Sequence, residues 1–116
     1  MKSALVITPT TGASVLKDAI ESVQNQDYDN VEHLVVIDGE KFSKKTYATL
    51  NEIDKKSKLQ IALVPYNTGG DGFYGHRIMA AFSHLCHHDY ILFLDQDNWY
   101  ETNHVSSLIK EIEEFN

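Results

Sequence analysis

Four short, mostly apolar runs constrain the fold of this chain more than any other feature. These runs cover residues 4–7, 31–37, 59–64 and 90–94. After each run, apolar residues recur at helical spacing, over residues 15–23, 47–53, 78–85 and 105–112. Such alternation indicates a parallel sheet covered by helices, since the strands of a parallel sheet are buried on both sides. We therefore predict an α/β fold with a mostly parallel sheet of about four strands and helices on both faces.

Length and composition limit the classes of protein to consider. The 116 residues are enough for one modest domain, which we expect to span 1–116. The net charge of -7 argues against a nucleic-acid partner, because a duplex-binding surface needs clustered Lys and Arg. A single cysteine, Cys86, excludes an internal disulfide and fits a reducing compartment. No apolar run is long enough to span a bilayer, so we expect a cytoplasmic protein, with peripheral membrane contact left open.

Polar and glycine-rich residues follow each of the apolar runs. In open parallel sheets, ligands bind beyond the carboxyl ends of the strands. The residues expected there are Thr8-Pro9-Thr10, Asp38, the glycine-rich residues 66–75, and Asp95-Gln96-Asp97. We predict that these four segments meet at one edge of the sheet and form a binding site.

The two carboxylates of Asp95 and Asp97 indicate a metal site. Residues 90–94 are apolar and lead directly into this pair. Residues two apart in extended chain project from the same side, so we expect both carboxylates together at a buried strand end. Like charges are unfavourable in such a place unless a cation binds them. Oxygen ligands favour Mg²⁺ or Mn²⁺ over zinc. The alternative is that the two acids cap a loop or the following helix.

Several motifs occur in a specific order along the chain. They are Pro9-Thr10, Asp38-Gly39, Asn67-Thr68-Gly69, Arg77 and Leu94-Asp95-Gln96-Asp97. This ordered set resembles the nucleotide-binding half of a GT-A glycosyltransferase, most closely the large family 2 group. The resemblance covers nearly the whole chain and implies a Rossmann-like domain that binds a nucleotide-sugar.

The resemblance implies roles at the nucleotide. Thr8, Pro9 and Thr10 would line the nucleobase pocket, largely through their backbone. Asp38 would contact the base or the ribose, and Arg77 would face the nucleotide or its diphosphate.

Further roles follow at the metal and the sugar. Asn67 and Gly69 would belong to the nucleotide-sugar site. Asp95 would lie near the ribose and the metal, and Asp97 would ligate the metal directly. Mn²⁺ or Mg²⁺ would bridge both phosphates and act as a Lewis acid.

The chain departs from the family pattern at three places. Ile37 replaces one of the paired acids that commonly precede the glycine, so base recognition would rest on Asp38. Residues 69–76 form a longer, glycine-rich loop, either a flap over the donor or a plain surface connection. Family members continue past the acidic motif into an acceptor-binding segment that usually supplies the general base. Here Glu101 and His104 are the nearby titratable residues, and we assign neither as the base.

The resemblance implies a metal-dependent glycosyltransferase that transfers a hexose from a UDP-sugar to an acceptor hydroxyl, with inversion. The acceptor, a saccharide or another hydroxyl compound, is not specified by the sequence. A homodimer or a partner subunit would complete the acceptor side of the site. The alternative is a non-catalytic nucleotide-sugar-binding module or subunit that lacks the acceptor half.

Overall fold

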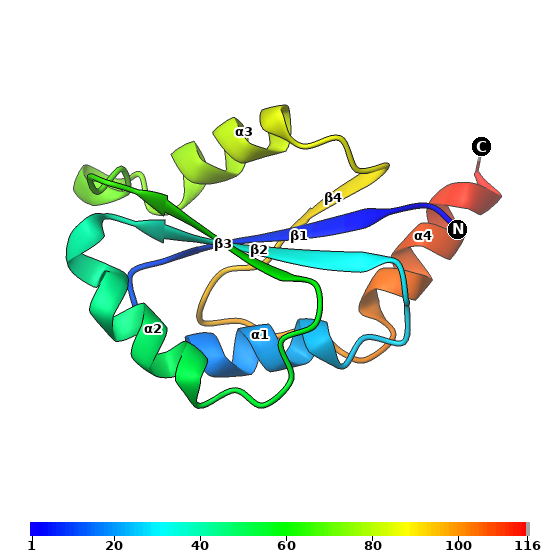
Figure 1. The fold of residues 1–116 in the computed structure, drawn as a ribbon. Coiled ribbons are helices and arrows are strands. Elements are labelled where there is room, and N and C mark those ends of the chain that lie inside the picture. The colour runs from blue at the N-terminus through cyan, green and yellow to red at the C-terminus, as the bar shows by residue number, and fades with distance from the viewer. Residues whose placement is uncertain (116) are drawn as a thin grey trace.

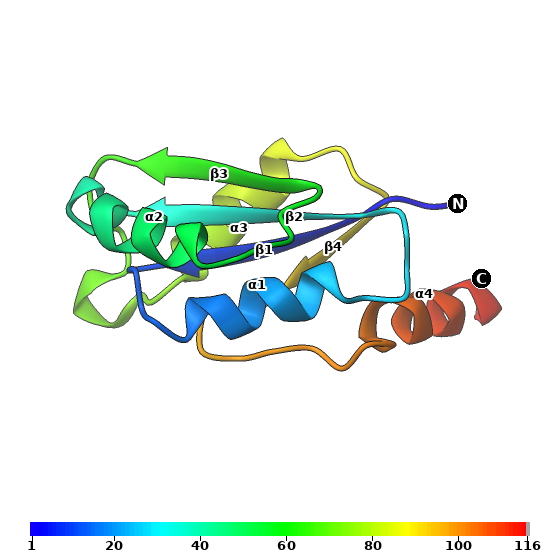
Figure 2. The same ribbon diagram turned by 60° about the horizontal axis from the view of Figure 1, so that its bottom comes forward.

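Four parallel strands in the order β3-β2-β1-β4 form the central sheet (Figures 1 and 2). The structure is a computed structural model and describes residues 1–115. The strands are β1 (Ala4–Thr10), β2 (Val31–Asp38), β3 (Leu59–Val64) and β4 (Tyr90–Phe93). The predicted parallel α/β sheet is confirmed.

Helices cover both faces of the sheet, as predicted. They are α1 (Leu16–Gln24), α2 (Ser43–Asn51), α3 (His76–Leu85) and α4 (His104–Glu114), with short 3₁₀ turns at Glu40–Phe42 and Gly70–Gly72. Figure 1 shows α3 on one face and α1 and α2 on the other. Among residues 1–115, no helix is both long and apolar enough to cross a membrane.

The alternating side chains of β1 supply both halves of the core. All seven residues of β1 are buried. Ala4 and Val6 pack with residues of α1 and α4, whereas Leu5 and Ile7 belong to the cluster on the α3 face. A third cluster joins α1, α2 and β2. Truncating a buried residue such as Ile7 to Ala typically costs about 2–5 kcal/mol, so β1 anchors both layers.

The strand order changes direction at β1. Strands β2 and β3 lie on one side of β1, and β4 lies on the other. In open α/β sheets, ligands bind beyond the carboxyl ends of the strands at such a point. The carboxyl ends of β1 and β4 are therefore the place to look for a site.

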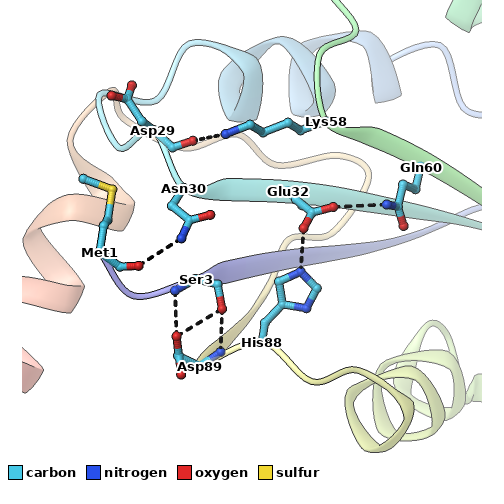
Figure 3. Close-up of polar contacts among 9 residues, drawn as sticks. All are labelled: Met1, Ser3, Asp29, Asn30, Glu32, Lys58, Gln60, His88 and Asp89. Carbon is cyan, nitrogen blue, oxygen red and sulfur yellow. Dashed lines mark hydrogen bonds and ion pairs between the residues drawn. The ribbon is translucent and has the colours of Figure 1, made fainter.

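Polar contacts close the opposite, amino-terminal end of the sheet (Figure 3). Glu32 on β2 accepts a hydrogen bond from Gln60 Nε2 on β3 at 3.1 Å and lies 3.0 Å from His88 Nε2. The Asp89 carboxylate accepts hydrogen bonds from the backbone N–H and the hydroxyl of Ser3. Contacts of this kind near the surface contribute little free energy each, but they tie neighbouring segments together at this end of the sheet.

Candidate functional site

A cavity of about 780 Å³ opens at the carboxyl ends of the strands, and we call it the rim cavity. Its volume lies in the range of about 300–1,000 Å³ that is usual for small-molecule sites. It is lined by Pro9, Thr10, Thr11, Ala13, Asp38, Asn67, Gly69, Gly70, Tyr74, Gly75, His76, Asp95, Gln96 and Asp97. Segments far apart in the sequence thus meet at one place, where the sequence pattern predicted a site.

Most of the predicted site residues line the rim cavity, and two do not. Those that line it are Pro9, Thr10, Asp38, Asn67, Gly69, Asp95 and Asp97. Thr8 and Arg77 are absent from its lining. The Thr8 side chain is fully buried, and its hydroxyl lies 2.7 Å from His33 Nε2. Any contact of Thr8 with a ligand would therefore have to go through its backbone.

Arg77 is engaged by an aromatic ring outside the rim cavity. Its guanidinium carbon lies 3.6 Å from the centroid of the Phe73 ring. An exposed cation–π contact of this kind is worth about 0.5–1 kcal/mol. The preceding residue, His76, lines the cavity in its place. The first turn of α3 thus presents an imidazole to the site rather than the guanidinium that we expected.

Asp38 is buried and held in a fixed position at the end of β2. Its side chain is only 2% exposed, and Oδ1 accepts hydrogen bonds from Thr68 N at 2.7 Å and Thr68 Oγ1 at 2.9 Å. Asn67 Nδ2 donates to the Asp38 carbonyl at 2.9 Å. Within residues 1–115, no hydrogen bond to Oδ2 is found. This second oxygen is available to accept a hydrogen bond from a ligand.

The acidic pair lies in a turn and not in extended chain. Strand β4 ends at Phe93, and the Asn98 N–H donates to the Asp95 carbonyl at 3.1 Å. Asp95 and Asp97 are both exposed, so the expectation of two carboxylates at a buried strand end is wrong. The two side chains nevertheless line the same cavity, because the turn brings them there.

Gln96, between the two acids, attaches this turn to the end of β1. Its Oε1 accepts hydrogen bonds from Thr10 Oγ1 at 2.7 Å and Thr11 N at 3.0 Å. Its Nε2 lies 3.1 Å from Thr11 Oγ1 and donates to it. The sequence contained no signal for this role, because the middle position of the acidic motif has no required side chain. Gln96 fixes the position of the acids relative to β1.

The glycine-rich loop forms one wall of the rim cavity rather than a plain surface connection. Gly69, Gly70, Tyr74 and Gly75 all line the cavity. A Cβ on Gly69 would lie 2.1 Å from the Tyr74 carbonyl oxygen, and Tyr74 N donates to the Gly69 carbonyl at 2.9 Å. A Cβ on Gly75 would lie 2.7 Å from Pro9 Cγ. Glycine at these two positions permits close approaches that no other residue fits.

The residues present fit a divalent metal ion that takes some of its ligands from the protein and the rest from a bound substrate. Within the described part of the chain, neither Asp95 nor Asp97 has a hydrogen bond or an ion pair on its carboxylate. The same residues contain no cluster of three or more His, Cys, Asp or Glu that could enclose an ion. Mg²⁺ typically binds one or two carboxylates together with substrate phosphates and water. Two uncommitted carboxylates at an open cavity match that ligand set.

Solved structures of the S. aureus protein TarS share this fold. A crystal structure of TarS residues 1–349 superposes with a TM-score of 0.74 at 21% identity, covering 97% of this chain and 32% of that one. The same segment in complex with UDP-GlcNAc gives a TM-score of 0.73 at 19% identity, covering 98% and 32%. A third structure holds UDP. The chain therefore spans about a third of these TarS structures, and the likeness confirms the predicted GT-A-type fold.

Comparison with family models identifies the chain more directly. A comparison with curated protein sequences gave no match. The model described as "Glycosyl transferase family 2" matches residues 5–116, which is nearly the whole chain. The chain belongs to glycosyl transferase family 2.

Proposed function

We propose that this domain binds a UDP-hexose in the rim cavity with Mn²⁺ or Mg²⁺ and transfers the hexose to an acceptor hydroxyl with inversion. The observation that carries the proposal is the meeting of buried Asp38 and the uncommitted acids Asp95 and Asp97 in one cavity of a family 2 domain. The TarS structures with UDP-GlcNAc and UDP support the choice of nucleotide.

Asp38 would recognise the uridine end of the donor. Its Oδ2 would accept a hydrogen bond from the base or the ribose, while Thr68 holds Oδ1 in place. Pro9 and Thr10 lie beside it in the cavity wall. A carboxylate positioned in advance loses little conformational entropy on binding, which favours affinity.

The negative charge of the rim cavity favours a cation as a partner in diphosphate binding. Its lining contains three aspartates and no Lys or Arg. A diphosphate placed beside these carboxylates would be repelled unless a divalent ion lay between them. Asp95 and Asp97 would hold this ion, which when bound offsets the charge that grows on the leaving diphosphate. The negative charge of the rim cavity thus supports a metal-dependent donor site.

The transfer itself exchanges two bonds at the anomeric carbon. The acceptor oxygen forms a bond to this carbon from the face opposite the diphosphate, the bond from the carbon to the phosphate oxygen breaks, and UDP and the hydroxyl proton are released. A homodimer or partner subunit that completes the acceptor side stays a prediction.

Calorimetry with UDP and UDP-GlcNAc, with and without Mn²⁺, tests the proposal. We expect Mn²⁺ to strengthen binding and Asp97→Asn to weaken the Mn²⁺-dependent affinity at least about tenfold. Asp71→Asn is the matched control, because it removes one charge from the same rim at a residue outside the cavity lining. Asn also tolerates the left-handed backbone at this position, where φ is 60°. Affinity that ignores both Mn²⁺ and Asp97→Asn would contradict the proposal.

A turnover assay separates the enzyme from its alternative, a non-catalytic nucleotide-sugar-binding module. Release of UDP that depends on added acceptor supports transfer. Tight donor binding without UDP release across a panel of hydroxyl acceptors would instead support the binding module.

A further inference from the structure

A second cavity, of about 480 Å³, adjoins the rim cavity, and we call it the side cavity. His76 and Asp95 line both cavities. The rest of the side-cavity lining comes mainly from β4 and from the segment between β4 and α4. A compound in the side cavity would therefore meet the donor next to Asp95.

An exposed indole marks the wall of the side cavity. Trp99 lines the cavity and is 61% exposed, and Phe93 beside it in the lining is 47% exposed. Two exposed aromatic rings in the lining of one cavity give a ligand an apolar surface to pack on. The apolar C–H face of a pyranose ring packs well on an aromatic ring, and Asn98 and Glu101 in the same lining offer hydrogen bonds to hydroxyl groups.

The segment that carries Trp99 is held in place by its neighbours. The Tyr100 hydroxyl donates to the Phe93 carbonyl, and the Tyr100 ring stacks on His104 with centroids 4.1 Å apart. The Glu101 carbonyl accepts hydrogen bonds from Gln26 Nε2 at 2.7 Å and His104 N at 3.0 Å. This wall is therefore formed before a ligand arrives, which reduces the entropy lost on binding.

The charges of the side cavity disfavour an anionic ligand. Asp95 and Glu101 are its carboxylates, and no Lys or Arg lines it. Glu101, which has no role in holding the metal, would repel a phosphorylated or carboxylated acceptor, whereas an uncharged polyhydroxy compound would not be repelled.

From these observations we propose that the side cavity is the acceptor subsite and that it binds a neutral, ring-form saccharide stacked on Trp99. The proposal rests on the proposed transferase function, because it takes the rim cavity as the donor site. Trp99 determines which acceptors bind, and Asp95 marks the boundary where the acceptor hydroxyl meets the donor.

Fluorescence of Trp99, the single tryptophan of the chain, reports directly on this subsite. The probes are methyl β-glucoside, methyl N-acetyl-β-glucosaminide and cellobiose as neutral saccharides, and glucose 6-phosphate as the anionic comparison. Each is titrated with and without UDP and Mn²⁺. We expect a saturable change in emission with at least one neutral probe and a weaker response to glucose 6-phosphate.

Ligand-observed NMR on variants then tests the role of the indole ring. We expect Trp99→Ala to weaken affinity for the responding saccharide about tenfold and Trp99→Phe to weaken it less, since part of the stacking surface remains. Tyr47→Ala is the matched control, because Tyr47 is 50% exposed on α2 and lines neither cavity. UDP affinity is expected to stay within twofold in all three variants.

The outcomes distinguish this proposal from the proposed function. The acceptor subsite is overturned if no neutral saccharide changes the emission, if glucose 6-phosphate binds more tightly than methyl β-glucoside, or if Trp99→Ala leaves saccharide affinity unchanged. Calorimetry with UDP on the same samples tests the donor site separately. Saccharide binding without UDP binding would contradict the donor assignment and leave the side cavity a saccharide site with no acceptor role. UDP binding without saccharide binding would contradict the acceptor subsite alone.

Discussion

At the scale of single residues, the shape of the rim cavity depends on a glycine, Gly69, that has no side chain. Gly69 approaches the Tyr74 carbonyl so closely that a Cβ would lie 2.1 Å from its oxygen. The backbone at Gly69 has φ of -89°, which any residue can adopt, so the requirement for glycine is one of space alone.

Replacing Gly69 separates this steric requirement from general loop effects. We expect Gly69→Ala to lower the free energy of unfolding by about 1–3 kcal/mol and to weaken UDP binding, because the loop wall must move outward. Gly70→Ala is the control, since its Cβ would meet only the side-chain atom Asn67 Oδ1, at 3.2 Å. Urea unfolding and calorimetry measure both effects, and equal losses in the two variants would refute the steric explanation.

The residue scale also shows where sequence patterns were insufficient. The place of Asp38 could be predicted because it directly follows an apolar strand of a parallel sheet, whose carboxyl ends meet at one edge. The position of the Arg77 side chain could not, because it depends on stacking with Phe73, a contact set by the fold of the glycine-rich loop. Gln96 was missed for a similar reason, since its partners Thr10 and Thr11 lie some 85 residues away.

At the scale of elements, the sequence predicted where the strands lie better than it predicted the residues at which they end. Strand β1 was expected over residues 4–7 and continues to Thr10. A proline usually interrupts a central strand, because proline has no backbone N–H to donate to a neighbouring strand. Here β1 pairs with β4 only as far as Ile7, so Pro9 lies where the strand has one neighbour and proline is tolerated.

The side-chain amide of Gln96 holds the turn from Asp95 to Asn98 in position against β1. We expect Gln96→Leu to weaken Mn²⁺-dependent UDP binding at least about tenfold, because the three hydrogen bonds lost between the turn and β1 are together worth about 1.5–4.5 kcal/mol. Gln60→Leu at the amino-terminal end of the sheet is the control, since Gln60 donates to Glu32 far from the site. Calorimetry measures the affinity of both variants for UDP in the presence of Mn²⁺. Similar affinities in the two variants would show that the turn holds its position without Gln96.

At the scale of the whole molecule, stability depends on a neutral histidine in the core. His33 on β2 is 1% exposed, and burial lowers its pKa from 6.5 to about 3. The unfolded chain therefore binds a proton more readily than the folded one between these two values. The stability contributed by neutral His33 is fully present above pH 6.5 and is lost as the pH falls toward 3.

Urea unfolding at two pH values tests this linkage. Between pH 6.5 and pH 5, we expect the free energy of unfolding of the native protein to fall by about 2 kcal/mol more than that of His33→Gln, which has no titrating group at this position. Gln also retains a group able to hydrogen-bond Thr8. An equal decrease in both proteins would show that His33 is not the source of the acid sensitivity.

The central position of β1 also affects how the nascent chain folds. Strand β1 (Ala4–Thr10) is synthesised well before its neighbour β4, which begins only at Tyr90, and Ser3 and Asp89 are 86 positions apart. At a synthesis rate of about 5–20 residues per second, one edge of β1 waits roughly 4–17 s for its partner. During that interval one edge of β1 is unpaired, and unpaired strand edges of this kind are prone to aggregation.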